Sequence, residues 1–452
     1  MEIPGKLSTQ QRVVIVGAGF AGLTLAKKLS PAYFQVILID KNNYHQFQPL
    51  LYQVATAGLE PNSISFPLRK VFQKKKNVFI RIAEVTAVHP VEKKIATSTG
   101  ELDYDFLVLA HGAATNYFGM QDIAQNAFSM KSVSEALLLR NTLLQNYEQA
   151  LITVNKKEKA ALLNIVIVGG GPTGVELAGA IAEMKTQILP RDYPELNFNN
   201  MNIHLIEAAP RLLNGMSEES AARVRSYLGA LRVKIQTGVS VKSYDGYAAT
   251  LSNHTTLYSY CLIWAAGIKG RALKGVPAVN VLPDHSIVVD ECNRLKGQRY
   301  IFALGDATRM PLKTNPGGYP QVAPVAMQQA TQLAANFKRL VQQKEMKPFT
   351  YRNKGSMAIV GRNRAVAETA GIKLSGFPAW MAWLVVHLMS IIGIKNRLLI
   401  LVNWMWQYIT YDQSLRLIIR SSERKSSSTT NKTSDNEKIG NDLTAHRSLV
   451  GV

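Results

Sequence analysis

Two copies of one glycine-rich pattern constrain this sequence more than any other feature. The first follows the apolar run at 13–16 and has glycines at 17, 19 and 22. The second follows the run at 163–168 and has glycines at 169, 171 and 174. Apolar residues at helical spacing come next in both copies. A strand, a G-x-G-x-x-G turn and a helix form the dinucleotide-binding βαβ unit, in which N–H groups at the helix start face the phosphates. The chain therefore predicts an α/β fold with two Rossmann-like units.

An acidic residue ends the second strand of each unit. Asp40 lies 23 residues after Gly17, close to the roughly 20 expected for the residue that binds the adenosine ribose. Glu207 lies 38 residues after Gly169, and an insert at 189–200 with two prolines explains the longer spacing. A carboxylate accepts a hydrogen bond from a ribose 2′-hydroxyl and repels a 2′-phosphate. Glu207 therefore favours NADH over NADPH.

A later strand returns the chain to the first unit. The run at 299–304 leads into Gly305 and Asp306. Directly after a buried strand, Asp306 is expected to hydrogen-bond a cofactor hydroxyl rather than to cap a helix. We therefore expect an FAD-binding domain at 10–120 and 290–350, with a linker helix and an inserted NADH-binding domain at 121–289. Two bound dinucleotides imply hydride exchange between them.

The residues expected to bind these two cofactors gather at the glycine turns and at the ends of the buried strands. They are Gly17, Ala18, Gly19, Phe20, Ala21, Gly22, Asp40, Lys41, Val85, Ala110, Gly112, Asp306, Gly169, Gly171, Pro172, Thr173, Gly174, Glu207, Ala266 and Gly267.

Two further helices are predicted outside the glycine patterns. Ser132 and Glu135 have the spacing of a capping box, which opens a helix through about Leu151. A second helix is expected from about Pro324 to Leu340. Cys261 and Cys292 are the two cysteines of the chain, and they form no C-x-x-C pair. We therefore expect ordinary reduced thiols, without a dithiol relay or a metal site.

The C-terminal part differs in composition from the rest. Residues 377–394 contain 18 positions without a formal charge, and a second apolar segment at 398–411 carries Trp404, Trp406 and Tyr408. A helix of 18 residues spans about 27 Å, at the low end for crossing a bilayer. Tryptophan suits the depth of lipid headgroups. We expect residues 351–420 to associate with a membrane and residues 421–452, rich in Ser, Thr and Asn, to be a disordered tail.

The net charge of +21 indicates a polyanionic partner, which is either nucleic acid or an anionic membrane surface. Tryptophan and apolar residues lie among the C-terminal basic residues, which favours a membrane and no nucleic acid. The first strand begins close to the N-terminus, with no leader before it. The expected location is the cytoplasmic face of the inner (plasma) membrane, where the protein would be peripheral or monotopic.

From Gln11 to Arg420 the sequence resembles the type II (non-proton-pumping) NADH:quinone oxidoreductases. The resemblance implies an FAD on the first unit, NADH on the second, C-terminal helices that anchor the enzyme peripherally, and a membrane quinone as electron acceptor. It is carried by Gly17–Gly22, Tyr44–Thr56, Gly169–Gly179, Leu304–Ala307, Gly361–Val366, Lys373–Trp380 and Asn396–Leu399.

Three residues are candidates for direct roles in the reaction. Glu176, next to the second glycine turn, is expected to position nicotinamide and flavin and to link the site to a proton source, although a first-turn carboxylate also suits a helix dipole. Gln328 fills the second glutamine of an A-Q-x-A-x-Q pattern that lines the quinone tunnel in the family, whereas Pro324 replaces the first. Lys373 is expected either near the flavin and quinone or at the lipid surface.

Two other functions compete with this interpretation. A sulfide:quinone type of flavoenzyme needs a cysteine pair beside the flavin, which two isolated thiols do not supply. A redox-sensing flavoprotein, including a DNA-associated one, would use the positive charge to bind polyanions. Neither the identity of the quinone nor a possible homodimer follows from the sequence.

Overall fold

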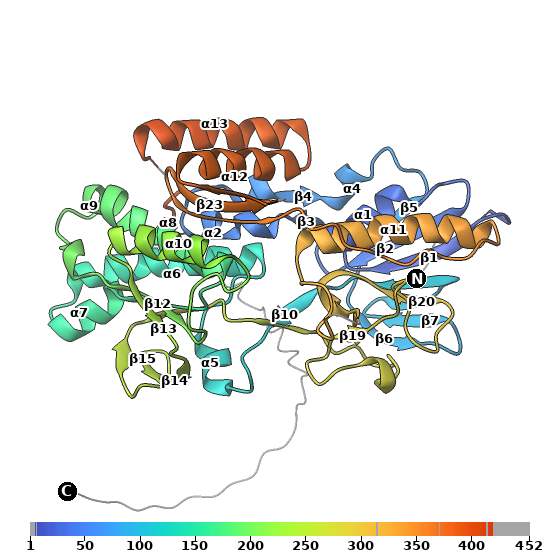
Figure 1. Ribbon diagram of the computed structural model, residues 1–452, viewed down its shortest axis with the longest axis horizontal. Coiled ribbons are helices and arrows are strands. Elements are labelled where there is room, and N and C mark those ends of the chain that lie inside the picture. The colour runs from blue at the N-terminus through green and yellow to red at the C-terminus, as the bar shows by residue number, and fades with distance from the viewer. Residues whose placement is uncertain (1–4, 6, 313–314, 370, 413–414, 419–452) are drawn as a thin grey trace, which may run out of the picture. The chain divides into compact units, whose positions relative to one another are not determined.

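The computed structural model describes residues 5, 7–312, 315–369, 371–412 and 415–418 (Figure 1). The tail predicted at 421–452 lies outside the described residues.

The first glycine pattern lies in a five-stranded parallel sheet of order β20-β9-β1-β2-β5. Helices α1 and α11 pack together on one face, and a small antiparallel sheet, β6-β7-β8, shares a core with the other face. Because both faces of the sheet are covered, the β1 residues 13–16 form a continuous apolar run, and all four are buried. The bounds are β1 Gln11–Val16, α1 Phe20–Lys28, β2 Phe34–Asp40, β5 Val78–Ile82, β6 Val85–His89, β7 Lys94–Thr97, β8 Gly100–Asp103, β9 Phe106–Leu109, β20 Ile301–Ala303 and α11 Ala323–Val341.

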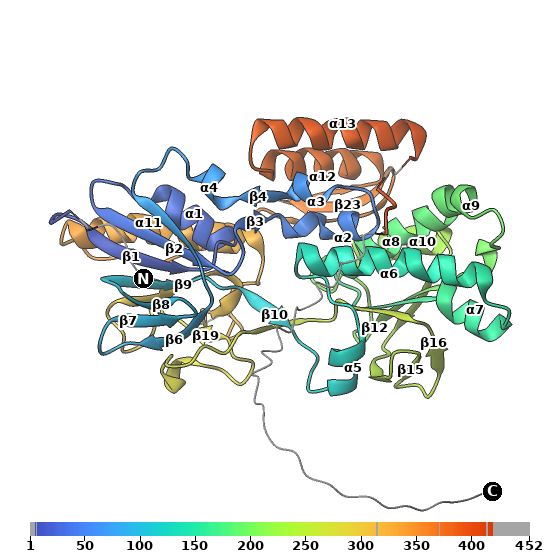
Figure 2. The same ribbon diagram turned by 180° about the vertical axis from the view of Figure 1, so that it is seen from behind.

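The late strand β20 pairs with β9, so the chain leaves this sheet and returns to it after the second glycine pattern. The second pattern lies in a parallel sheet of order β13-β12-β11-β17 (Figure 2). A two-stranded ribbon of β10 and β18 links the two regions. The bounds are β10 Ala113–Thr115, α5 Gln121–Asn126, α6 Val133–Ile152, α7 Lys156–Leu163, β11 Ile165–Val168, α8 Pro172–Glu183, β12 Ile203–Glu207, α10 Glu218–Ala230, β13 Lys234–Thr237, β14 Val241–Tyr244, β15 Ala248–Leu251, β16 Thr256–Tyr258, β17 Cys261–Trp264 and β18 Ile268–Gly270.

The helix predicted from the capping box is confirmed. The Ser132 hydroxyl accepts a hydrogen bond from the Glu135 N–H at 3.3 Å, and α6 begins at the next residue. The Glu135 carboxylate instead accepts from the Lys131 N–H at 2.6 Å. The helix predicted from Pro324 is likewise present, as α11.

A third region follows α11, and its strands were not predicted. The antiparallel sheet β22-β23-β24 packs against α8, where a Cβ on Gly179 would lie 1.8 Å from the Val360 carbonyl oxygen. Helices α12 and α13 then stack over this sheet (Figures 1 and 2). The bounds are β22 Ser356–Gly361, β23 Arg364–Thr369, β24 Ile372–Ser375, α12 Phe377–Ser390 and α13 Ile394–Thr410.

Gly393, at φ +85°, separates the two C-terminal helices. Neither of them, nor any other helix among the described residues, has the length and apolarity needed to cross a bilayer. The shorter elements are β3 Tyr44–Gln46, α2 Leu51–Ala55, α3 Pro61–Ile64, β4 Ser65–Pro67, α4 Leu68–Val71, a π-helical turn Met184–Ile188, α9 Leu189–Asp192, β19 Ile287–Val288 and β21 Thr308–Arg309.

Candidate active site

The first glycine turn has no room for side chains at two of its three glycines. Gly17 has φ +100°, and a Cβ there would lie 2.4 Å from the Ala110 carbonyl oxygen. A Cβ on Gly22 would lie 1.9 Å from the Gly17 oxygen. The Ala18 N–H donates to the Asp40 carboxylate at 2.7 Å. The turn is therefore held open by an acid at the carboxyl end of the neighbouring strand, as expected for a pyrophosphate cradle.

The second turn repeats this geometry. Gly169 has φ +112°, and a Cβ on Gly174 would lie 1.9 Å from the Gly169 oxygen. The Glu207 carboxylate accepts hydrogen bonds from the N–H groups of Gly170 and, at 2.6 Å, Ala209. Asp40 has the same two kinds of partner, the N–H after the first glycine of the turn and the N–H two residues after the acid. These are the N–H groups of Ala18 and, at 2.8 Å, Asn42. Each carboxylate keeps further lone pairs that a ribose hydroxyl can use.

The residues around the first turn fit FAD. Burial raises the pKa of Asp306, and the charge of Lys131 acts in the opposite direction. No hydrogen-bond donor contacts the Asp306 carboxylate among the described residues. The buried Nδ1 of His111 likewise has no hydrogen-bond partner among the residues that the structure describes. A half-buried carboxylate beside a glycine cradle can accept a hydrogen bond from a hydroxyl of a bound dinucleotide, and the imidazole nitrogen can bind one of its phosphate oxygens.

The other predicted cofactor residues lie at the same strand ends. Ala110 and Gly112 follow β9, and the Ala110 N–H donates to the Val16 oxygen at 2.8 Å. Ala266 and Gly267 follow β17 in the corresponding position of the second sheet. The remaining ones are Gly19, Phe20 and Ala21 at the start of α1, Gly171, Pro172 and Thr173 at the start of α8, Lys41 after β2, and Val85 at the start of β6.

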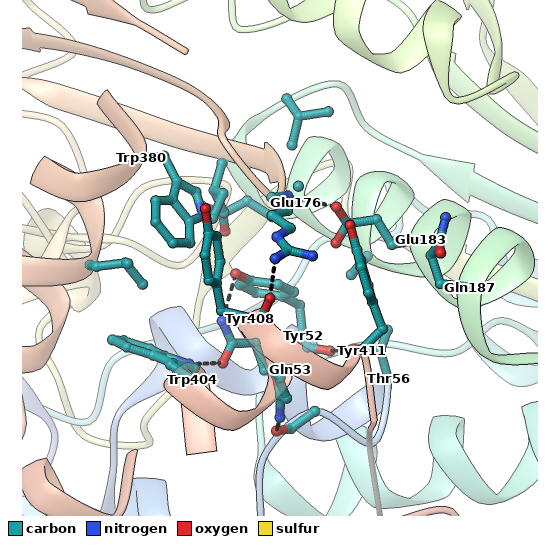
Figure 3. A pocket seen from close by; sticks show the side chains of 18 of the residues that line it. Tyr52, Gln53, Thr56, Glu176, Glu183, Gln187, Trp380, Trp404, Tyr408 and Tyr411 are labelled. Atoms are coloured by element: carbon teal, nitrogen blue, oxygen red, sulfur yellow. Dashed lines mark hydrogen bonds between the residues drawn. The ribbon is translucent and has the colours of Figure 1, made fainter. Parts of the chain in front are cut away.

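A cavity of about 130 Å³ lies where α2, α8, β22, α12 and α13 meet (Figure 3). Glu176, which is 9% exposed, faces this cavity from α8. Burial raises the pKa of Glu176 to about 8, although the Ile359 backbone and the Trp383 side chain act in the lowering direction. The carboxyl group is therefore mainly protonated at neutral pH and can act as a proton donor.

Aromatic side chains from the C-terminal helices close the cavity. The indole N–H of Trp404 donates to the Gln53 side chain at 2.9 Å (Figure 3). The Arg362 guanidinium lies between the rings of Tyr408 and Tyr411, at 3.9 and 4.3 Å from their centroids. The walls are thus apolar and aromatic, with a few polar groups, as in most small-molecule sites.

Sequence reasoning missed most of these lining residues. Tyr52 and Gln53 lie in the uncharged, amide-rich stretch 44–56 that the family resemblance already used, so a signal for them was present. Arg362 also lies in one of those stretches, but nothing local connected it to α8 or α13.

Two predicted catalytic residues are not in this cavity. Gln328 exchanges two hydrogen bonds of 3.0 Å with the Arg352 backbone, because α11 directs its side chain toward the 351–353 segment. Lys373 lies 3.3 Å from Glu219 on the exposed surface between β24 and α10. Of the three candidates, the structure brings only Glu176 into the cavity.

Comparison with known families agrees with this architecture. The sequence matches the pyridine nucleotide-disulphide oxidoreductase family over residues 11–330 and the NDH2 C-terminal domain over residues 353–410. The chain is therefore a flavoprotein oxidoreductase with two dinucleotide-binding domains, for FAD and NADH.

Individual relatives show which family of flavoprotein oxidoreductases the chain belongs to. The chain is 36% identical to the type II NADH:quinone oxidoreductase Ndh of Mycobacterium tuberculosis, with 87% of each chain covered. It is 27% identical to the type II NADH:quinone oxidoreductase of Staphylococcus aureus, with 81% of this chain and 92% of the relative covered. It belongs to the type II NADH:quinone oxidoreductase family, and it is an NADH dehydrogenase of that family.

Solved structures show the same fold. The NDH2 structure from Plasmodium falciparum in complex with NADH superposes with a TM-score of 0.83 at 22% identity and covers 91% of this chain and all of that one. The sulfide:quinone oxidoreductase of Aquifex aeolicus gives a TM-score of 0.68 at 19% identity, with 83% of this chain and 90% of that one covered. At these identities the likeness concerns the fold alone.

Proposed function

We propose that the quinone is reduced in the cavity lined by Glu176, while NADH binds at the second glycine turn and FAD at the first. Bound FAD supplies the two-electron relay between NADH and the quinone. The observation that supports this assignment most is the place of Glu176. One helix, α8, begins at the NADH turn and carries the buried carboxyl group into the cavity two residues after Gly174.

The residues of the cavity have three tasks in this reaction. The aromatic walls exclude water and hold a planar ring. The amide of Gln53 and the hydroxyl of Tyr52 offer hydrogen bonds to quinone oxygens. Glu176, mainly protonated at neutral pH, donates a proton to the developing quinol.

The apolar faces of α12 and α13 support association with a membrane. The exposed residues Leu398, Val402, Met405 and Trp406 recur at the spacing of one helix face, and the opposite face of α13 packs on the protein through Ile400 and Trp404. An exposed face of this kind, with basic residues at the start of the helix, suits insertion into an anionic interface. The cytoplasmic location, the homodimer and the absence of nucleic acid stay predictions.

Filling the cavity tests the placement of the quinone. Ala180 lines it on α8, and Ala180→Phe should leave reduction of the flavin by NADH unchanged but slow its reoxidation by quinone about 100-fold. Ala222→Phe, on the exposed face of α10, is the control. If Ala180→Phe reoxidised at the rate of the unmodified protein, the quinone would bind elsewhere.

A further inference from the structure

Glu183 is a second, half-buried carboxylate on α8, and it lies at the boundary between two cavities. It follows Glu176 by seven residues, which places the two side chains on one helix face about 10 Å apart along the axis. Glu183 lines the Glu176 cavity (Figure 3) and also a larger, polar cavity of about 1050 Å³. The larger cavity is bounded by polar side chains that include Asn197, Asn199 and Arg232.

The surrounding chain is built to hold this carboxylate. The Arg362 N–H donates to Glu183 Oε1 at 2.6 Å. A Cβ on Gly361 would lie 2.4 Å from the same oxygen, so a larger residue there would displace the carboxylate. The π-helical turn Met184–Ile188 begins directly after Glu183, and such turns are frequent at functional sites.

Tyr52 lies in the electrostatic field of both carboxylates. Burial raises the pKa of Tyr52, and the negative charges of Glu176 and Glu183 raise it further. The Tyr52 hydroxyl accepts a hydrogen bond from the Gln53 amide at 2.9 Å, which leaves its own O–H to be donated. A phenol with a free O–H, or a water beside it in the cavity, can connect two groups that are too far apart for direct transfer.

Proton balance requires such a connection. The overall reaction is NADH + H⁺ + quinone → NAD⁺ + quinol: the hydride brings two electrons and one hydrogen, and the second proton comes from water. Glu176 must be reprotonated after it has donated its proton. Because its side chain is only 9% exposed, the new proton has to reach it through the protein.

We propose that Glu183 carries this proton from the polar cavity to Glu176, by way of Tyr52 or water in the Glu176 cavity. The proposal rests on the role proposed for Glu176. Glu183 does not contact the quinone in this scheme and acts through Glu176.

The charges that face Glu183 come from several elements. Burial, the largest effect, raises the pKa of Glu183, whereas the Arg362 backbone hydrogen bond and the charges of Arg364 and Arg362 in the β22–β23 hairpin act in the lowering direction. Lys185 and Arg232 line the polar cavity, and Tyr408 of α13 and Tyr411, the residue after that helix, line both cavities.

The test compares Glu183→Gln, which keeps the acceptor for the Arg362 N–H, with Glu183→Asp, which keeps a titratable group. Stopped-flow spectroscopy measures flavin reduction by NADH and flavin reoxidation by quinone separately, in H₂O and D₂O and across pH. We expect Glu183→Gln to retain normal reduction, to slow reoxidation about 10- to 100-fold, and to show a larger solvent isotope effect and an altered pH profile. Glu183→Asp should restore part of the reoxidation rate. Glu219→Gln, which removes an exposed carboxylate of α10 outside both cavities, is the control.

Three results would overturn the relay. The first is reoxidation of Glu183→Gln at the normal rate, pH profile and isotope effect. The second is equal slowing of both half-reactions, which is the effect of a structural residue. The third is a reoxidation defect that Glu183→Asp does not relieve at all. If instead the unmodified protein were not reoxidised by quinone, the proposed function itself would fail, and the two failures are thereby distinguished.

Discussion

Glu176 shows how surroundings decide the chemistry of one side chain. Its carboxyl group lies on a helix between aromatic walls, so burial disfavours the charged form and raises its pKa to about 8. The native protein therefore binds a proton at Glu176 between pH 4.5, the ordinary value, and pH 8. The contribution of Glu176 to the free energy of unfolding is therefore fully present below its pKa in the unfolded chain. It is lost as the pH rises through its pKa in the folded protein.

We predict that Glu176→Gln removes this pH dependence. Relative to the variant, the free energy of unfolding of the unmodified protein should fall between pH 5 and pH 9, by an amount on the order of a few kcal/mol. Differential scanning calorimetry of both proteins across this range measures the difference in Tm, with Glu219→Gln as the control. A difference between Glu176→Gln and the unmodified protein that stayed constant with pH would contradict the assigned pKa.

Glu207 governs a different property, the choice of nicotinamide cofactor. Glu207→Arg removes a carboxylate that holds the Gly170 turn and adds a charge that attracts a 2′-phosphate. We expect the ratio of kcat/KM for NADH to that for NADPH to fall about tenfold or more, which corresponds to about 1.4 kcal/mol. Steady-state kinetics with both cofactors measures it, and an unchanged ratio would mean that the second unit is wrongly assigned.

At the scale of elements, both glycine turns depend on close contact between a helix and the strand before it. A Cβ on Gly174 would overlap the Gly169 oxygen, so α8 cannot approach β11 with any larger residue there. The first turn lies in a separate sheet with its own core. Damage to one turn should therefore leave the other able to bind its cofactor.

The variant Gly174→Ala tests whether FAD binding and NADH binding are independent. The purified variant should retain FAD, seen as yellow absorbance, but NADH should no longer bleach it at concentrations that saturate the unmodified protein. Gly215→Ala, whose Cβ would meet no atom within 4 Å, is the control. Loss of FAD from Gly174→Ala, with Gly215→Ala intact, would show that the two units are not independent.

The C-terminal helices give a prediction about membrane binding. Val402→Glu combined with Met405→Glu places two charges on the exposed face of α13 and leaves the packed face unchanged. We expect the double variant to stop co-sedimenting with anionic vesicles, while Ile152→Glu, at an exposed apolar position on α6, should still bind them. Co-sedimentation of the double variant at the normal level would contradict the assignment of this face.

At the scale of the whole molecule, what could be predicted depended on how local each signal is. The turns at Gly17 and Gly169 were predictable because strand, glycines and helix are consecutive in the chain. The cavity was not, because residues near 52, 176, 360 and 404 meet only after the β22–β24 sheet has packed on α8. For the same reason Gln328 and Lys373, chosen from local patterns, lie outside the cavity, whereas Glu176, on the helix of the second turn, lies within it.

In the reaction assigned to this protein, two electrons pass from NADH, through FAD, to a quinone. Stopped-flow spectroscopy of the detergent-purified protein tests it most directly, because the yellow absorbance of the flavin reports its redox state. We predict that NADH bleaches this absorbance and that a second mixing with quinone restores it with one equivalent of quinol formed per flavin. Bleaching by NADH without recovery on addition of quinone would contradict this electron path.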